Sequence, residues 1–278
     1  MIISVIIAAY NEGKYISRAL ASLNKQQLDH GDNLEIIVID DGSSDDTSSK
    51  AKKYPNVKLL HQNHKGAALS RNLGIKYARG EIVVLLDADM EFVSNFVANL
   101  IRPIKEGKVR GTFSRKEFVA NWKNWVARSW NWDNNLPAQM RLPADAPELG
   151  SDFRAILKSE FLRVNGFDDI GYNDSWTLAK KLGYQPVDAK DAIFYHHNVS
   201  SLAEAYNHAK WVSKRQYKLG NWGKIVALSR VSLPMSIAIG LYKSIMHIEP
   251  RFLVYKIVWD LGLTFGMIDM WISGKTSK

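Results

Sequence analysis

Residues 81–92 read EIVVLLDADMEF. A run of aliphatic residues leads directly into two aspartates one residue apart, Asp87 and Asp89, and Glu91 follows. The run predicts a strand, because strands buried on both faces are short and nearly continuous in apolar residues. A strand that ends in carboxylates is either a solvated turn or a place that holds a cation, and the rest of the chain has to decide between them.

Three further strand-like runs precede this one, at residues 2–10, 34–40 and 57–62, and helical patterns separate them. Such alternation predicts an α/β fold, with an open, mixed but mostly parallel sheet and helices on both of its faces. Ligands of these sheets bind beyond the carboxyl ends of the strands. Polar residues stand at three such ends, at residues 10–12, 40–42 and 87–89.

Composition limits the function classes. The 278 residues carry a net charge of +9, with a pI of about 9.5, which favours an anionic partner: nucleic acid, nucleotide phosphates or an acidic membrane surface. The absence of cysteine excludes disulfides, thiol catalysis and cysteine-ligated zinc. The N-terminal MIISVIIAAYNE has no basic n-region and no small-residue cleavage site, so we expect a first strand there and not a signal peptide.

Two common phosphate-binding motifs do not account for the polar strand ends. The first strand is followed by AAYNEGKY, which lacks the G-x-G-x-x-G of dinucleotide-binding domains. The GKT at residues 274–276 lacks the earlier glycine of a P-loop and follows no predicted strand. A carboxylate site remains, and it suits a divalent cation that bridges a diphosphate.

Five stretches, in this order, resemble glycosyltransferase family 2: SVIIAAYNE, VIDDGSSDDT, KGAALSRNLGIKYARGE, LLDADM and NGFDDIGYNDSWTLAKKLGY. The resemblance covers roughly residues 2–200. It implies a GT-A (Rossmann-like) fold and an inverting, metal-dependent transfer of a sugar from a nucleotide-sugar, with Mn²⁺ or Mg²⁺ as the cofactor.

The resemblance also implies the roles of individual residues. Positions that would bind the nucleotide-sugar are Ala8, Tyr10, Glu12, Asp41, Lys65, Arg71, Asp87, Ala88 and Asp89. Asp41 would contact the base. Asp89 would be the direct metal ligand and Asp87 would lie nearer the ribose, while Glu91 matches a further metal ligand of some polyprenyl-phosphate sugar synthases in the family.

Asp174 matches the catalytic base of the family, although the family commonly has Glu-Asp where this chain has Asn173-Asp174. A carboxylate in this role takes the proton from the acceptor hydroxyl, while the cation neutralises the charge on the departing diphosphate. If the acceptor is an ionised lipid phosphate, no base is needed, and Asp174 would only orient the substrate.

Simpler structural roles are open for several of these residues. Residues 40–43 (DDGS) could form only a turn, with Ser43 or Ser44 capping the next helix, and Asp174 could be a helix N-cap. Arg71 could merely pair with a nearby carboxylate. His196 and His197 end a strand-like run and could ligate a metal; we favour one histidine that packs or hydrogen-bonds and one that faces solvent.

The second half of the chain is basic and aromatic. Trp122, Trp125, Trp130 and Trp132 could be core residues, a platform for sugar stacking or an interfacial belt. The basic residues of the same segment favour an amphipathic helix that lies on a membrane. We weigh this interpretation about equally with simple core packing.

Two apolar segments, Val231–Ile248 and Phe252–Trp271, follow. The first is about 27 Å long as a helix, marginal for a bilayer core of roughly 30 Å. The second contains Lys256 and Asp260 at a spacing that lets them pair, and a small-residue face for close helix contact at Gly262 and Gly266. We favour a membrane-associated hairpin over a soluble helical pair.

We therefore expect a catalytic domain at residues 1–220, with a nucleotide-sugar half at 1–108 and an acceptor half at 109–220, and a membrane-associated or transmembrane hairpin at 221–278. The expected protein moves a hexose from a UDP- or GDP-sugar to a lipid-linked or envelope glycan acceptor at the cytoplasmic face of the cell membrane. A nucleotidyltransferase that forms nucleotide-sugars is disfavoured, because AAYNEGKY is not a glycine-rich, basic loop. A nucleic-acid-binding protein is disfavoured because the aromatic residues gather in apolar segments.

Overall fold

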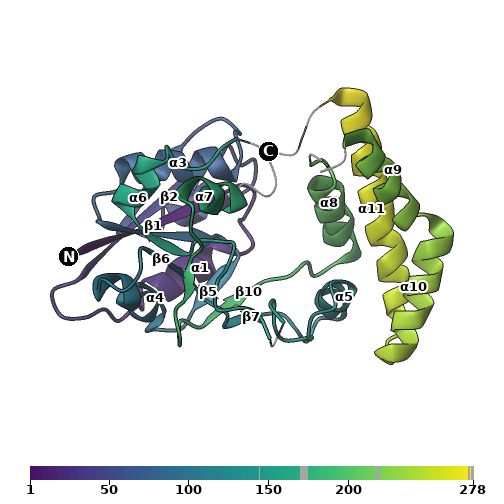
Figure 1. Ribbon diagram of the computed structural model, residues 1–278, viewed down its shortest axis with the longest axis horizontal. Coiled ribbons are helices and arrows are strands. Elements are labelled where there is room, and N and C mark those ends of the chain that lie inside the picture. The colour runs from purple at the N-terminus through teal and green to yellow at the C-terminus, as the bar shows by residue number, and fades with distance from the viewer. Residues whose placement is uncertain (144, 170–174, 216, 218–219, 275, 277–278) are drawn as a thin grey trace.

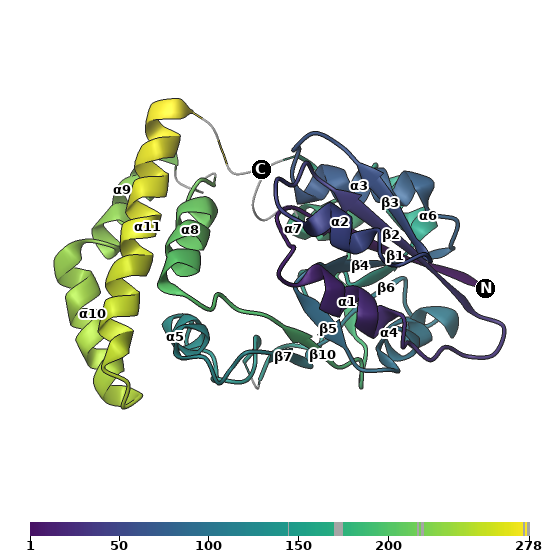
Figure 2. The ribbon, with the colours of Figure 1, turned by 180° about the vertical axis from the view of Figure 1, so that it is seen from behind.

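The computed structural model describes residues 1–143, 145–169, 175–215, 217, 220–274 and 276. The chain forms a sheet lobe and a helical lobe that lie side by side (Figures 1 and 2). The helix α8 (Leu202–Val212) lies on the side of the helical lobe nearer the sheet, and α10 (Leu233–Met246) lies at the outer edge.

The main sheet has the strand order β3 (Val57–His61), β2 (Asn33–Asp40), β1 (Ile2–Ala9), β4 (Ile82–Asp87), β8 (Ala155–Leu157), β6 (Gly111–Phe113) and β9 (Val187–Asp188). Only β8 runs antiparallel to its neighbours in this sheet. The mixed, mostly parallel sheet is therefore confirmed, and so are the four strands predicted in the first 89 residues.

Helices cover both faces of the sheet, as predicted. The helices α1 (Ile16–Leu23) and α4 (Phe96–Lys105) pack on one face, over Ile3, Val5 and Ile7 of β1. The helices α3 (Ala67–Tyr77), α6 (Lys158–Arg163) and α7 (Ser175–Leu182) pack on the other, over Ile6 and Ile37. The short helix α2 (Thr47–Ala51) follows β2. Alternate strand residues thus feed two separate cores, because successive side chains point to opposite faces.

A second, three-stranded sheet lies at the end of the main one. Its order is β5 (Met90–Phe92), β10 (Phe194–His196) and β7 (Glu117–Val119), with β10 antiparallel to β5 and parallel to β7. Each strand has three residues, too few to show a periodic pattern in the sequence. This sheet joins segments from distant parts of the chain beside the end of β4.

The helical lobe contains α5 (Trp125–Asp133), α8, α9 (Gly220–Arg230), α10 and α11 (Arg251–Ser273). The predicted close helix contact is confirmed: α11 packs on α8 at Gly262 and Gly266, and a β-carbon at Gly266 would collide with Ser213 and Lys210 of the α8 end. Trp125, Trp130 and Trp132 pack against the core of this lobe, which favours core packing over a membrane belt for these three.

Charged groups are buried inside the helical lobe. The Lys256 ammonium lies 3.1 Å from Asp133 of α5 and 3.0 Å from Asp260, so the predicted Lys256–Asp260 pair is confirmed. Ser236 of α10 donates a 2.7 Å hydrogen bond to Asp260. These contacts tie α5, α10 and α11 together.

Among the described residues no single helix is both long and apolar enough to span a membrane, whereas Trp222–Arg230 and Leu233–Met246, bent by 49°, meet that requirement as a pair. The domain division at residue 220 stays a prediction. The helices α5 and α8, from the predicted acceptor half, share one core with α11.

Candidate active site

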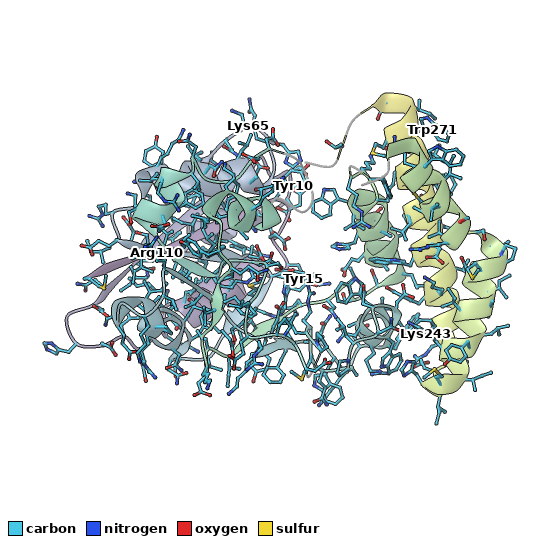
Figure 3. The ribbon with its side chains drawn as sticks, in the orientation of Figure 1. Tyr10, Tyr15, Lys65, Arg110, Lys243 and Trp271 are labelled. Carbon is cyan, nitrogen blue, oxygen red and sulfur yellow. The ribbon has the colours of Figure 1, made fainter. Side chains whose placement is uncertain are left out.

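The polar strand ends meet at one edge of the main sheet. Parallel pairing sets Ala8 opposite Asp87 and Ala9 opposite Asp40, so the ends of β1, β2 and β4 coincide. Figure 3 shows Tyr10 and Tyr15 on the side of the sheet lobe that faces the helical lobe. Lys14 bridges the two lobes at this point, with its ammonium 2.7 Å from Glu204 of α8.

Asp87 is held between two arginines. Arg71 of α3 donates to Oδ1 at 2.6 Å, and Arg154, which directly precedes β8, donates to Oδ2 at 3.0 Å. Burial favours the neutral acid, but the charges of Arg154 and Arg71 outweigh it and hold the pKa of Asp87 well below its usual range. The pairing considered for Arg71 is thus present, while Arg154 was not singled out from the sequence.

Asp89 begins a chain of charged contacts. Its Oδ2 lies 3.0 Å from His196 Nε2, and His196 Nδ1 lies 2.7 Å from Glu117 Oε1. Arg141 completes the chain, with Nε 3.3 Å from the same Glu117 oxygen. Because each ring nitrogen of His196 faces a carboxylate, both nitrogens act as donors in the charged imidazolium.

The electrostatics agree with a charged His196. Burial and the nearby Arg141 oppose its charge, but Asp89 and Glu117 outweigh them and raise the pKa of His196 to about 9. Burial would raise the pKa of Glu117, yet the hydrogen bond with His196 and the charge of Arg141 lower it to about 2. Asp89 is therefore positioned by a histidine that is itself fixed by a buried carboxylate.

His197 contacts the other predicted metal position. Its Nε2 lies 2.6 Å from Glu91 Oε1, and its ring stacks on Tyr15 at 4.7 Å between centroids. His196 and His197 are only 8% and 9% exposed. The expectation that one of the two histidines faces solvent is wrong, because β10 ends between two carboxylate-bearing segments and each ring packs against one of them.

Glu12, in the loop after β1, shares this negative environment. Burial, followed by the charges of Asp89 and Asp87, raises the pKa of Glu12 to about 9. Ala88 is buried between the two aspartates. The carboxyl groups of Glu12, Asp87 and Asp89 thus lie close enough that the two aspartates disfavour ionisation of Glu12. A bound cation would relieve this repulsion.

Asp41 organises the loop between β3 and α3. It accepts hydrogen bonds from the backbone N–H groups of Lys65 and Gly66 at 2.9 and 2.8 Å, and its oxygens also contact Gln62 and His64. Tyr10 stacks on the His64 ring at 3.9 Å. The side chain of Lys65 is exposed on this loop.

The turn considered for residues 40–43 is present, because Asp40 accepts the Ser43 N–H. The helix α2 begins after Asp46 with no side-chain cap, so Ser43 and Ser44 are not its caps. Contact of Asp41 with a nucleotide base stays a prediction.

Asp174, the predicted catalytic base, lies outside the described residues. Its two predicted roles, as the base and as a helix N-cap, therefore stay predictions. In the described part of the chain no three or more His, Asp or Glu side chains form a group that could hold a metal by themselves. The donor set at the strand end still suits a hard cation, because Mg²⁺ typically binds one or two protein carboxylates and completes its shell with water and substrate phosphates.

The family model described as Glycosyl transferase family 2 matches residues 4–163, more than half of the chain. The chain belongs to glycosyltransferase family 2. The matched region contains most of β1, all of β2 to β4, the Asp87–Asp89 segment and Arg154, whereas His196 and His197 lie beyond it.

Similar curated proteins are glycosyltransferases. The glycosyltransferase GlyG of Streptococcus pneumoniae is 34% identical over 110 residues, which cover 38% of this chain and 36% of GlyG. The UDP-Glc:alpha-D-GlcNAc-diphosphoundecaprenol beta-1,3-glucosyltransferase WfgD of Escherichia coli is 32% identical over 123 residues, 43% of this chain and 47% of WfgD. The chain thus spans less than half the length of these two relatives.

The fold of this family 2 glycosyltransferase is also found in solved structures. The mannosyltransferase PcManGT from Pyrobaculum calidifontis, in complex with GDP-Man and Mn²⁺, aligns with a TM-score of 0.61 at 17% identity, over 98% of this chain and 88% of PcManGT. At that identity the likeness shows the fold, which confirms the GT-A architecture.

Proposed function

We propose that this protein is an inverting, metal-dependent hexosyltransferase that uses a UDP- or GDP-sugar and acts on a lipid-linked or cell-envelope glycan acceptor. The observation that carries the proposal is the meeting of Asp87, Asp89 and Glu12 at the carboxyl edge of the sheet, where the charge of the first two raises the pKa of the third. Such a site has the charge to bind a divalent cation and, through it, a diphosphate.

Asp89 is the proposed main ligand of Mn²⁺ or Mg²⁺, with Asp87 and Glu91 as the further candidates. When bound, the ion supplies positive charge that stabilises the departing nucleoside diphosphate. Among its described contacts, His196 engages only Oδ2 of Asp89, which leaves Oδ1 for a ligand. Arg71 and Arg154 hold Asp87 ionised, and His197 holds Glu91 at 2.6 Å.

The nucleotide is proposed to lie along the loops after β1 and β3. Tyr10 and His64 form a stacked aromatic pair there, and Asp41 fixes the backbone of Lys65 and Gly66. Both oxygens of Asp41 already accept hydrogen bonds from this loop. We therefore propose that Asp41 shapes the base-binding loop in addition to any direct contact with the base.

The acceptor is proposed to approach from the side of the helical lobe, where Lys14 joins the loop after β1 to α8. Inversion requires a single displacement, in which a carboxylate takes the proton of the incoming hydroxyl. Asp174 keeps that proposed role. The names of relatives support the substrate classes: WfgD is named for UDP-Glc and a diphosphoundecaprenol acceptor, and PcManGT was solved with GDP-Man.

The test is a transfer assay with radiolabelled UDP- and GDP-hexoses and a bacterial lipid extract, with Mn²⁺ or with EDTA. We expect transfer with one donor class, its loss in EDTA, and at least about a hundredfold loss in Asp89→Asn. Asp29→Asn is the matched control, because Asp29 is a 61% exposed carboxylate on the surface. Transfer by Asp89→Asn at the rate of the Asp29→Asn control would disprove the site assignment.

A further inference from the structure

The helix α10 has its polar and apolar faces exchanged relative to an ordinary surface helix. Its large apolar side chains point to solvent: Leu233, Met235, Ile237, Leu241, Tyr242, Ile245 and Met246 are 38–78% exposed. Together with Ile248, which is 91% exposed in the turn after α10, they form a surface that we call the outer face. Soluble proteins seldom expose a continuous apolar surface of this kind without a partner.

The polar residues of α10 point inward instead. Ser236 is 1% exposed and hydrogen-bonded to Asp260, and Ser244 accepts the N–H of Leu253. Lys243 donates to the carbonyls of Trp132 and Asp133 in α5, and Figure 3 shows it on the α5 side of α10. Since each inward polar group has a protein partner, the helix is held in this orientation, and its apolar face is directed outward by the fold.

Ile248 gives a second, independent sign that exposure of the outer face is functional. Its φ is +51°, in the left-handed region that β-branched residues rarely adopt and that glycine or asparagine adopts easily. The turn between α10 and α11 therefore accepts backbone strain while it places an isoleucine in solvent. Strain of this kind persists mainly where the residue serves a purpose other than stability.

The charge of the same region identifies the chemistry of the partner. Residues 201–278 contain eleven lysines and arginines and four acidic residues. Each of the four acids is already paired: Glu204 with Lys14, Glu249 with Arg251, Asp260 with Lys256 and Asp269 with Lys214. The charge left unpaired by these acids is therefore positive. Two of the basic residues, Arg215 and Lys224, line a hollow of about 400 Å³ near the C-terminal end of α11.

We propose that the outer face of α10 docks on a lipid bilayer that contains anionic phospholipids, with α10 lying in the plane of the headgroup–acyl boundary. An apolar face on a lobe with surplus positive charge matches such a surface. The fourteen residues of α10 are about 21 Å long, shorter than a hydrocarbon core of roughly 30 Å, which favours an interfacial helix over a spanning one. Docking requires neither donor nor acceptor, so it can be tested separately from the proposed transferase activity.

The absence of cysteine from the 278 residues allows a direct test on the whole of this chain. The variant Ile245→Cys is labelled with an environment-sensitive fluorophore. Leu162→Cys, on α6 of the sheet lobe, is the matched control, because Leu162 is 50% exposed. With vesicles of phosphatidylcholine and phosphatidylglycerol, we expect a blue shift at position 245 and none at 162. Nitroxide groups near the lipid headgroup should quench the label more than nitroxides at the acyl-chain end.

Ile248→Gly separates a docking role from a structural one. Glycine relieves the strain at φ +51°, so thermal stability should stay equal or rise, whereas the dissociation constant for the vesicles should increase at least roughly tenfold. A loss of thermal stability with unchanged vesicle binding would overturn the assignment of Ile248.

Three other results would overturn the proposal as a whole. No spectral change at position 245 would show that the outer face does not meet lipid. Stronger quenching from the acyl-chain end would show a spanning helix. A wild-type dimer in lipid-free solution that fails to bind vesicles, and that Ile245→Glu converts to a monomer, would show that a second copy of the chain covers the face.

Discussion

Arg154 lies against Asp87, with Nη1 3.0 Å from Oδ2, although 67 residues separate the two in the sequence. Arg154 precedes the one antiparallel strand of the main sheet, β8, which pairs with β4 and so carries the guanidinium to the end of β4. The same guanidinium lies 5.6 Å from the ring centroid of Phe194. The sheet thus supplies its own counter-charge to Asp87.

Removal of that counter-charge should cost stability. We expect Arg154→Met to lower the free energy of unfolding by about 2–3 kcal/mol, because Asp87 would keep its charge in a largely buried place after losing one of its two arginine partners. Urea titration monitored by circular dichroism measures the change.

The double variant Arg154→Met/Asp87→Asn should recover most of this loss, since it removes both charges. Arg110→Met is the control: Arg110 is 64% exposed in its pair with Glu160, and its loss should change stability by less than about 0.5 kcal/mol. Equal losses in the two single variants would contradict a buried ion pair at Asp87.

His196 should make stability depend on pH. Its folded pKa of about 9 lies above the ordinary value of 6.5, so its contribution is complete below pH 6.5 and is lost as the pH rises through 9. In EDTA we expect His196 to contribute a fall of up to about 3 kcal/mol in the free energy of unfolding across that interval.

The control for this pH dependence is His196→Asn. Its free energy of unfolding should change less with pH over the same interval than that of the wild type. Glu117 stays ionised throughout, because its pKa is about 2. Glu12, with a pKa of about 9, titrates in the same interval, so the difference between the two profiles reports His196, and neither profile does so alone. Parallel profiles for the two proteins would mean that His196 is neutral in the folded state.

The buried lysine of the helical lobe offers a further prediction. Lys256→Met should destabilise the protein by about 3 kcal/mol, because Asp133 and Asp260 would be left facing each other at distances set for an ammonium between them. Lys108→Met is the control, since Lys108 is 71% exposed in its pair with Glu106. A change in Lys256→Met no larger than in the control, by thermal unfolding, would show that solvent reaches the cluster.

The sequence was sufficient for β1 to β4 because their signals are local, whereas β6, β8 and β9 of the main sheet were not predicted. Each of β1 to β4 is a short, mostly apolar run, and parallel pairing then determines that Ala8, Asp40 and Asp87 meet at one edge. The Lys256–Asp260 pair and the Gly262–Gly266 contact are equally local, as they depend only on helical spacing.

The surroundings of the aspartates could not be predicted, because they depend on contacts between distant segments. Glu117 and His196 stand on three-residue strands that pair in a separate sheet, and Arg154 depends on the antiparallel insertion of β8. His196 and His197 are evident as candidates in the sequence, but their three carboxylate partners are 79, 107 and 106 residues away. The order of the strands β5, β10 and β7 brings these histidines and carboxylates together, and the sequence does not reveal that order.

The exchanged faces of α10 also lay beyond sequence reasoning. The apolar run predicted a membrane-related helix, yet the direction of its few polar residues depends on the positions of α5 and α11.

The most direct measurement is calorimetric titration of the purified protein with UDP and with GDP, in Mn²⁺ and in EDTA, for the wild type, Asp89→Ala and Asp29→Ala. The proposed site predicts that one of the two nucleotides binds in Mn²⁺, that EDTA abolishes the binding, and that Asp89→Ala loses it while Asp29→Ala keeps it. Binding that is independent of metal and equal in all three proteins, or no binding of either nucleotide to a folded wild type, would contradict a nucleotide-diphosphate site at Asp89.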